Sequence, residues 1–172
     1  MALSARRLLS GLTLAVLGAN ALAQQPPAPS PAPAARAHFP WSSANAPPPV
    51  AGLHLGDTRA TVEARFGNAP ESRPAGAGLA LEYPDQGVSI LLGAGSDVSM
   101  IYLLTRAAGS IDGVRVGDGR DEVIAHWGEP PLAQGAQAMY TAGDWAVVVE
   151  LGAAQRVVSI SLGRAYGNTD LR

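Results

Sequence analysis

The chain of 172 residues contains no cysteine, and its 12 cationic side chains are all arginine. Without cysteine, disulfides, thiol nucleophiles and thiolate metal ligands are excluded. For the same reason we expect no cysteine-linked lipid anchor of the bacterial lipoprotein type. The formal net charge is −2, and a weakly acidic chain without basic clusters binds nucleic acid poorly. We therefore expect no nucleic-acid partner.

Histidine is also scarce, since only His38, His54 and His126 occur. A nucleophilic triad needs serine, histidine and an acid brought together, and a metal site needs clustered ligands. His38 lies in a proline-rich segment, His54 lies just before one predicted helix and His126 lies on another. A glycine-rich phosphate motif with its lysine is also lacking. The sequence therefore predicts no catalytic residue, no metal site and no cofactor, and hence a protein that is not an enzyme.

Residues 1–23 have the three parts of a Sec-type secretory signal. Arg6 and Arg7 form the charged start, an apolar run follows from Leu8 to Leu17, and small residues flank a cleavage position after Ala23. The apolar run is shorter than the roughly 20 residues that span a bilayer. The sequence predicts a periplasmic or secreted protein with no membrane span after cleavage of the signal.

Residues 24–50 are dominated by proline and alanine. Proline removes amide donors and favours extended backbone, so this segment is predicted to be a disordered, semi-rigid spacer. A proline-rich ligand for an envelope partner is the alternative. The aromatic residues Phe39 and Trp41 interrupt the spacer, and they either dock on the following domain or belong to the linker.

The most informative pattern is an internal repeat. Residues 52–67 align without gaps with residues 113–128, and both segments contain Gly-Asp, a central valine and a terminal glycine. A repeated segment of this kind indicates a duplicated structural unit. We predict a first repeat over 51–108, a second repeat over 109–163, and a flexible tail over 164–172.

Each repeated segment is typical of one short helix. In the first copy Asp57 is predicted to be the N-cap, because a short carboxylate accepts from unpaired amides at a helix start. Val62 and Phe66 are four residues apart and share a helix face, and Gly67 suits a left-handed stop. The second copy has the same features at Asp118, Val123, Trp127 and Gly128.

Three β-rich runs follow each helix, bounded by turn residues. The runs are 79–83, 88–92 and 98–104 in the first copy, and 136–140, 145–151 and 156–162 in the second. Each repeat is thus predicted to be a helix followed by a β-meander. The fold class is α+β, with two tandem repeats forming one antiparallel sheet of about six strands. Both helices would pack on one face and leave the other face open.

The motif that begins Leu55-Gly56-Asp57-Thr58-Arg59 and continues through Val62, Phe66-Gly67 and Pro70 into a meander resembles a known module. It resembles the repeat of the β-lactamase inhibitory protein family, and it is similar to the small outer-membrane β-barrel assembly lipoprotein. The tandem arrangement resembles the inhibitor most. That resemblance implies a concave sheet that grips another protein, with an acidic turn entering its active site. The matching turns here are residues 83–87 and 142–146.

These turns supply the candidate binding residues, since exposed Tyr and Trp are enriched among binding hot spots. The predicted protein-binding residues are Tyr83, Asp85, Tyr140, Asp144 and Trp145. Anchoring of the sheet core is the alternative for the three aromatic side chains. The leading hypothesis is an exported, non-catalytic module that binds another envelope or extracellular protein, with inhibition as the form of binding that the resemblance implies. The alternatives are an envelope or outer-membrane assembly accessory and, as a minor one, an enzyme.

Overall fold

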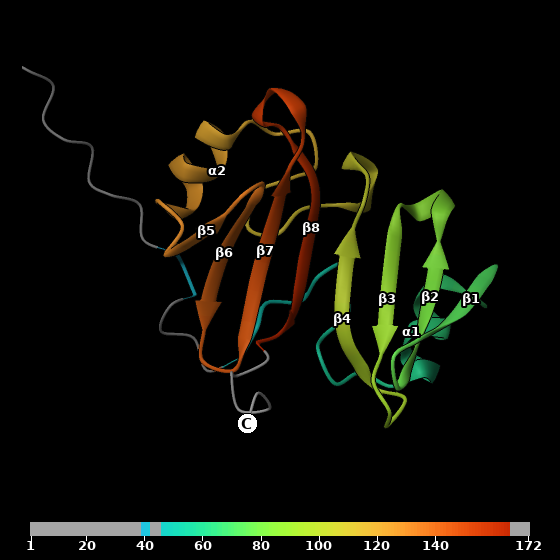
Figure 1. The fold of residues 1–172 in the computed structure, drawn as a ribbon. Helices are drawn as coiled ribbons and strands as arrows, with labels where there is room; N and C mark the ends of the chain where they lie inside the picture. The colour runs from blue at the N-terminus through green and yellow to red at the C-terminus, as the bar shows by residue number, and fades with distance from the viewer. Residues whose placement is uncertain (1–38, 42–45, 166–172) are drawn as a thin grey trace, which may run out of the picture. The chain divides into compact units, whose positions relative to one another are not determined.

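The computed structural model describes residues 39–41 and 46–165. The predicted signal over 1–23, most of the predicted spacer and residues 166–172 of the predicted tail lie outside these described residues. Within the described part the fold is α+β, with two α-helices and one antiparallel sheet of eight strands (Figure 1). The predicted fold class is thus confirmed, but the predicted number of about six strands is wrong.

The described chain runs through two successive sets of one helix and four strands. The first set is α1 (Arg59–Phe66), β1 (Glu71–Ala75), β2 (Gly78–Tyr83), β3 (Val88–Leu92) and β4 (Val98–Leu103). The second set is α2 (Arg120–Trp127), β5 (Leu132–Gln134), β6 (Gln137–Ala142), β7 (Trp145–Leu151) and β8 (Val157–Arg164). Short 3-10 helices lie at η1 (Pro84–Gln86), η2 (Arg106–Ala108) and η3 (Ala153–Gln155). We call the two sets the first half and the second half.

The strand order is β1-β2-β3-β4-β8-β7-β6-β5. The last strands of the two halves therefore meet at the centre, where β4 pairs antiparallel with β8 and Tyr102 lies opposite Ser161. The two strands that sequence analysis missed, β1 and β5, form the edges of the sheet. Four of the five residues of β1 are exposed and one of the five is Pro74, while all three residues of β5 are exposed. Edge strands of this kind lack the apolar alternation that sequence analysis detects.

Equivalent positions in the two halves make equivalent contacts. The Tyr83 hydroxyl donates to the Gly67 carbonyl at 3.1 Å, and the Tyr140 hydroxyl donates to the Gly128 carbonyl at 3.0 Å. Each of these bonds fastens the end of a helix to the second strand of its half. Both glycines have positive φ, 82° and 79°, which a side chain would strain. Their ψ lies near 180°, so they end the helices by an extended residue rather than the predicted left-handed helical one.

The helices begin one residue later than predicted. In the first half Thr58 is the N-cap, and its hydroxyl accepts from the Thr61 backbone N–H at 3.3 Å. The Asp57 carboxylate instead accepts from the backbone N–H of His54 at 2.8 Å. Asp57 thus closes the turn that leads into α1, because its side chain points back along the chain.

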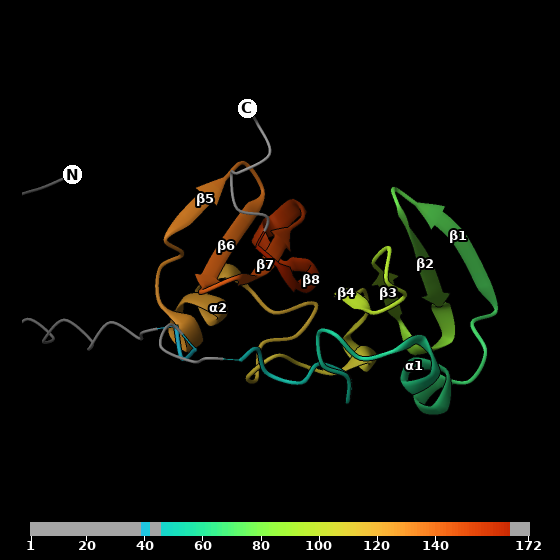
Figure 2. The same ribbon diagram turned by 90° about the horizontal axis from the view of Figure 1, so that it is seen from below.

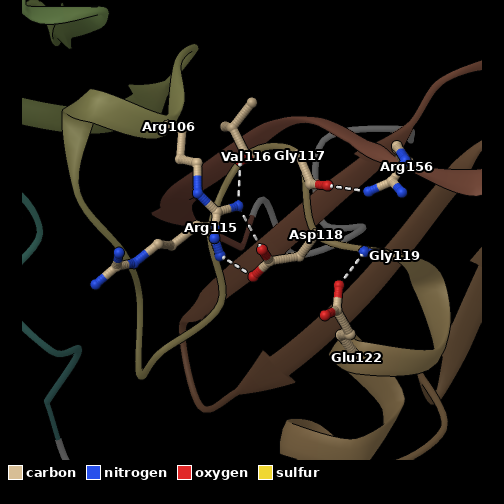
Figure 3. Close-up of polar contacts among 8 residues, drawn as sticks. All are labelled: Arg106, Arg115, Val116, Gly117, Asp118, Gly119, Glu122 and Arg156. Carbon is tan, nitrogen blue, oxygen red and sulfur yellow. Dashed lines mark hydrogen bonds and ion pairs between the residues drawn. The ribbon is translucent and has the colours of Figure 1, made fainter.

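The second half has the same arrangement with an added arginine (Figure 3). Gly119 is the N-cap of α2, and its backbone N–H donates to the Glu122 carboxylate at 2.6 Å. The Asp118 carboxylate accepts from the Arg115 backbone N–H at 2.8 Å and from Arg106 Nη1 at 2.7 Å. Since Arg106 lies in η2, this ion pair ties the connection between the halves to the start of α2.

The hydrophobic core lies on one face of the sheet. Val62 of α1 and Val123 and Trp127 of α2 are buried there, and both helices lie on the same side of the sheet (Figure 2). The strand residues in the same cluster include Leu81, Ile90, Ile101, Val147, Ile160 and Leu162. In the part of the chain that the structure describes, no helix packs on the opposite face. The predicted packing of both helices on one face is therefore what the structure shows.

The Asp118 turn should make stability depend on pH. Burial of Asp118 acts to raise its pKa, but the hydrogen bonds from Arg106 and Arg115 and the charges of both arginines outweigh burial and lower the pKa below its usual 3.8. A carboxyl whose pKa is lower in the folded state stabilises the fold above its unfolded pKa. That contribution is lost as pH falls through the folded pKa.

We therefore expect Asp118→Asn to lower the free energy of unfolding at pH 7 by about 1 to 2 kcal/mol. This is the value of a hydrogen bond to a charged group, reduced because Arg106 is exposed to solvent. At roughly pH 3 the difference from the unsubstituted chain should shrink. Urea denaturation at both pH values measures it. Asp57→Asn is the matched control and should cost less, since the Asp57 carboxylate lies 3.9 Å from His54 Nδ1, whereas that of Asp118 forms an ion pair with Arg106. Equal losses at the two pH values would contradict this account.

Candidate functional site

Three of the five residues predicted to bind a partner lie in the core. Tyr83, Tyr140 and Trp145 are all at most 1% exposed and belong to the same buried cluster. Burial raises the pKa of both tyrosines, that of Tyr140 to about 12. Their hydroxyls already donate to backbone carbonyls. The structure therefore gives these three rings the alternative role, anchoring the core, and they do not present a surface to a partner.

The other two predicted residues, Asp85 and Asp144, are exposed but lie apart. Asp85 follows β2 and Asp144 follows β6. Five antiparallel pairings separate these strands in the sheet, so β2 and β6 run in opposite directions. Their ends lie at opposite ends of the sheet (Figure 1). The two predicted turns are therefore not brought together into one site.

The helix-free face of the sheet is the alternative candidate. Paired residues on neighbouring antiparallel strands point to the same face. One row of pairs runs across six strands from β2 to β6, through Glu82, Ser89, Tyr102, Ser161, Val148 and Met139. The row alternates along each strand with the core residues, so it lies on the face opposite the helices. We call this surface the open face.

The open face carries apolar side chains that are only partly covered. Leu91, Met100, Tyr102, Met139 and Val148 are half-buried. Leu104, just beyond β4, is 44% exposed, and Leu132 on the edge strand β5 is 52% exposed. The predicted binding residues were drawn from the turns, and none of them belongs to this band. One pattern in the sequence indicates the band. Strands such as β3 and β7 have apolar residues at successive positions, so both the core face and the opposite face carry apolar side chains.

The first half of the open face is hollowed. A cavity of about 430 Å³ is lined by residues of β1 to β4 and the residue after β4: Arg73, Ala75, Ala80, Glu82, Ser89, Leu91, Tyr102 and Leu104. The small side chains of Ala80 and Ser89 leave room beside the larger Leu91 and Tyr102. An ion pair between Arg73 Nη2 and Glu82 Oε1 at 3.1 Å forms the rim. An apolar floor with a polar rim suits an apolar side chain of a partner.

Two kinds of feature are absent from the described residues. Residues 39–41 and 46–165 contain no cluster of three or more His, Cys, Asp or Glu that could hold a metal ion. Across the same described ranges, no helix is long and apolar enough to cross a bilayer.

Two aromatic residues of the predicted spacer, Phe39 and Trp41, enlarge the aromatic core of the second half. Phe39 is only 7% exposed and stacks on Tyr140, with ring centroids 5.1 Å apart. Its ring also lies 5.9 Å from Trp127 and 6.2 Å from Trp145. Trp41 lies 5.9 Å from Trp127. Of the two alternatives for these linker aromatics, the structure shows docking on the domain. We call the five rings the aromatic cluster.

Comparison with known proteins gives a likeness of fold. No protein-family model and no curated protein matches the chain. A solved cysteine-rich secretory protein from Staphylococcus aureus has a TM-score of 0.56 at 15% identity, and the match covers 69% of this chain and 48% of that chain. This chain therefore spans about half the length of that protein. At such low identity the likeness shows the fold alone.

Two further solved structures score lower and support no argument. One is a DUF4309 family protein from Bacillus subtilis, with a TM-score of 0.49 at 16% identity over 66% of this chain and 83% of that one. The other is an extracellular protein containing an SCP domain from Bacillus anthracis, with 0.45 at 9% identity over 64% and 44%. None of these three is a β-lactamase inhibitory protein or an assembly lipoprotein, so that resemblance stays a prediction.

The docking of Phe39 has a measurable consequence. We expect Phe39→Ala to lower the free energy of unfolding by about 3 kcal/mol, because a buried ring is removed from the core. Pro40→Ala is the matched control, since Pro40 is exposed in the same segment, and it should change stability by less than about 1 kcal/mol. Thermal or urea unfolding measures both. Similar small effects of the two substitutions would mean that the aromatics belong to the linker.

Proposed function

We propose that this protein is an exported, non-catalytic module that binds another envelope or extracellular protein on its open face. The observation that carries the proposal is a broad sheet face with partly covered apolar side chains and a polar-rimmed hollow. Protein interfaces combine an apolar centre with a polar rim in this way. The apolar band continues from Leu91 in the first half to Met139 in the second, which is wider than the hollow itself and favours a protein over a small molecule.

The resemblance to the inhibitory protein family supports the same face. The resemblance implies a concave sheet that grips a target protein. In this chain the helix-free side of the sheet is the corresponding surface. Inhibition of a target enzyme is the form of binding that the resemblance suggests. The acidic turns are less well placed to contribute together, because Asp85 follows β2 and Asp144 follows β6, and these two strands end at opposite ends of the sheet.

We further propose that the two halves are copies of one module that have diverged on the open face. The contacts that fold each half match, as the two tyrosine hydrogen bonds illustrate. On the open face the corresponding positions differ, since Tyr102 faces its counterpart Ser161 across the centre. The hollow with the Arg73–Glu82 ion pair lies on the first half of the open face. A partner would therefore bind in one orientation.

Export gives the first test. We expect the mature protein to begin at Gln24, because the small residues at the end of the predicted signal suit cleavage after Ala23. N-terminal sequencing and intact mass of the protein from the periplasm or culture medium measure this. Ala23→Arg should block processing. A protein recovered with Met1 intact and inside the cell would contradict the proposal of export.

Binding gives the second test, with two variants of matched exposure. Leu104 lines the hollow and is 44% exposed, whereas Val158 is 45% exposed and does not line it. We expect the mature chain to recover a specific protein from envelope or culture extract. Leu104→Asp should weaken that binding about tenfold or more, because a charge replaces an apolar contact. Val158→Asp should leave it unchanged.

Mass spectrometry of cross-linked complexes identifies the partner, and titration with the purified partner gives the affinities. Circular dichroism confirms that both variants fold. No specific partner with the unsubstituted chain would count against the proposal, and equal weakening by the two variants would count against the hollow as the place where the partner binds.

A further inference from the structure

The hollow on the first half of the open face contains a buried serine. Among the residues that the structure describes, Ser89 is the only buried one with a polar side chain other than tyrosine and tryptophan, and it is 8% exposed. Its side chain lines the hollow. Within the same described ranges the Ser89 hydroxyl forms no hydrogen bond. Since a buried hydroxyl without a bond costs stability, this group indicates a place where a ligand supplies the bond.

Ser89 lies beside a carboxylate with which it does not bond. It is paired directly with Glu82 across β3 and β2, and the Glu82 side chain is only 21% exposed. The second half contains a similar pair across β8 and β7, where the Ser159 hydroxyl donates to Glu150 Oε2 at 3.0 Å. The first half therefore leaves open a bond that the second half makes. An atom that enters between Ser89 and Glu82 can accept from the hydroxyl and donate to the carboxylate, and a hydroxyl group does both.

The rest of this hollow is mostly apolar. Ala75, Ala80, Leu91 and Leu104 line it with methyl groups, and the cavity measures about 430 Å³. The two alanines are small, so a flat ring has room between the larger leucines. Binding pockets of this kind take a group with an apolar body and few polar atoms at fixed places.

The charges at the rim favour a neutral group. Arg73 Nη2 lies 3.1 Å from Glu82 Oε1, so these two charges offset each other. Glu71 lies opposite Glu82 and lines a second hollow of about 310 Å³, which shares Arg73, Glu82 and Leu104 with the first. An acidic side chain would meet two carboxylates, and a basic one would compete with Arg73. A neutral side chain leaves the ion pair in place.

We propose that the hollow takes a tyrosine side chain of the protein that binds the open face. This inference rests on the function proposed above and names the residue that anchors the partner. The ring packs between Leu91 and Leu104, and its hydroxyl accepts from Ser89 and donates to Glu82. The Arg73 side chain is 68% exposed and lies over the ring from the solvent side. Tyrosine is also enriched among the residues that contribute most to binding at protein interfaces.

Two short peptides test this preference without the partner. Both have the sequence Ala-Ala-X-Ala-Ala with blocked ends, and X is tyrosine in one and phenylalanine in the other. Amide NMR signals of the isotope-labelled mature chain report where each peptide binds. We expect saturable shifts at Ser89, Glu82 and Leu91 with the tyrosine peptide, at a dissociation constant of about 1 mM. The phenylalanine peptide should bind about tenfold more weakly, because it leaves the polar groups of the hollow without a bond.

Substitution of the serine tests the hydrogen bond itself. Ser89→Ala should weaken binding of the tyrosine peptide roughly fivefold and leave that of the phenylalanine peptide unchanged. The thermal unfolding temperature should stay the same or rise, since a buried hydroxyl without a bond is removed. Ser159→Ala is the matched control, because Ser159 also lies beside a glutamate on a paired strand but outside the hollow. It should leave the affinity for both peptides unchanged.

Four results would overturn the proposal. They are the absence of saturable shifts with the tyrosine peptide up to about 10 mM, equal or tighter binding of the phenylalanine peptide, equal effects of Ser89→Ala on both peptides, and a lower unfolding temperature of Ser89→Ala. The last result would mean that the hydroxyl makes a structural bond.

These results are distinguishable from a failure of the proposed function. If a protein partner is recovered and Leu104→Asp weakens its binding, equal affinities for the two peptides reject the tyrosine and retain the function. If the tyrosine peptide binds in the hollow as expected but no protein is recovered, the preference of the hollow is retained and the function is rejected.

Discussion

The rest of the structure depends on the antiparallel pairing of β4 with β8. Without it each of these strands would expose a row of unpaired backbone groups at an edge, and the two halves would hold separate four-stranded sheets. With Tyr102 opposite Ser161, the two sheets become one. The same pairing places both helices on one face, joins the two halves of the open face, and turns the second half around, so that equivalent hairpins point to opposite ends.

This turned arrangement gives each face a different character. On the helix side, equivalent contacts recur, such as the two tyrosine hydrogen bonds to helix-ending glycines. On the open face the pairing brings unlike residues together, as at Glu82 beside Ser89 and Val148 beside Ser161. The residues that stabilise the fold therefore lie on the helix side, and the residues that differ between the halves lie on the open face. Two halves of similar fold thus form a surface with little internal symmetry.

Much of this fold could be predicted from the sequence. Val62 with Phe66 and Val123 with Trp127 locate the helices and their buried faces, and the glycines after them mark where the helices end. The edge strands could not be predicted, because β1 and β5 are polar or short and carry no apolar alternation. The burial of Tyr83, Tyr140 and Trp145 could not be predicted for a related reason. A tyrosine at a strand end looks the same in sequence whether its ring faces solvent or, as Tyr140 does, the core.

The position of Phe39 also decides how force enters the domain. The chain passes through the aromatic cluster of the second half before it reaches α1 of the first. Any pull on the N-terminal side of residue 39 is therefore resisted first by rings packed against one another, and only afterwards by the sheet. The cluster is held by ring contacts that can release without breaking a strand pair, so it can yield under tension while the eight strands stay paired.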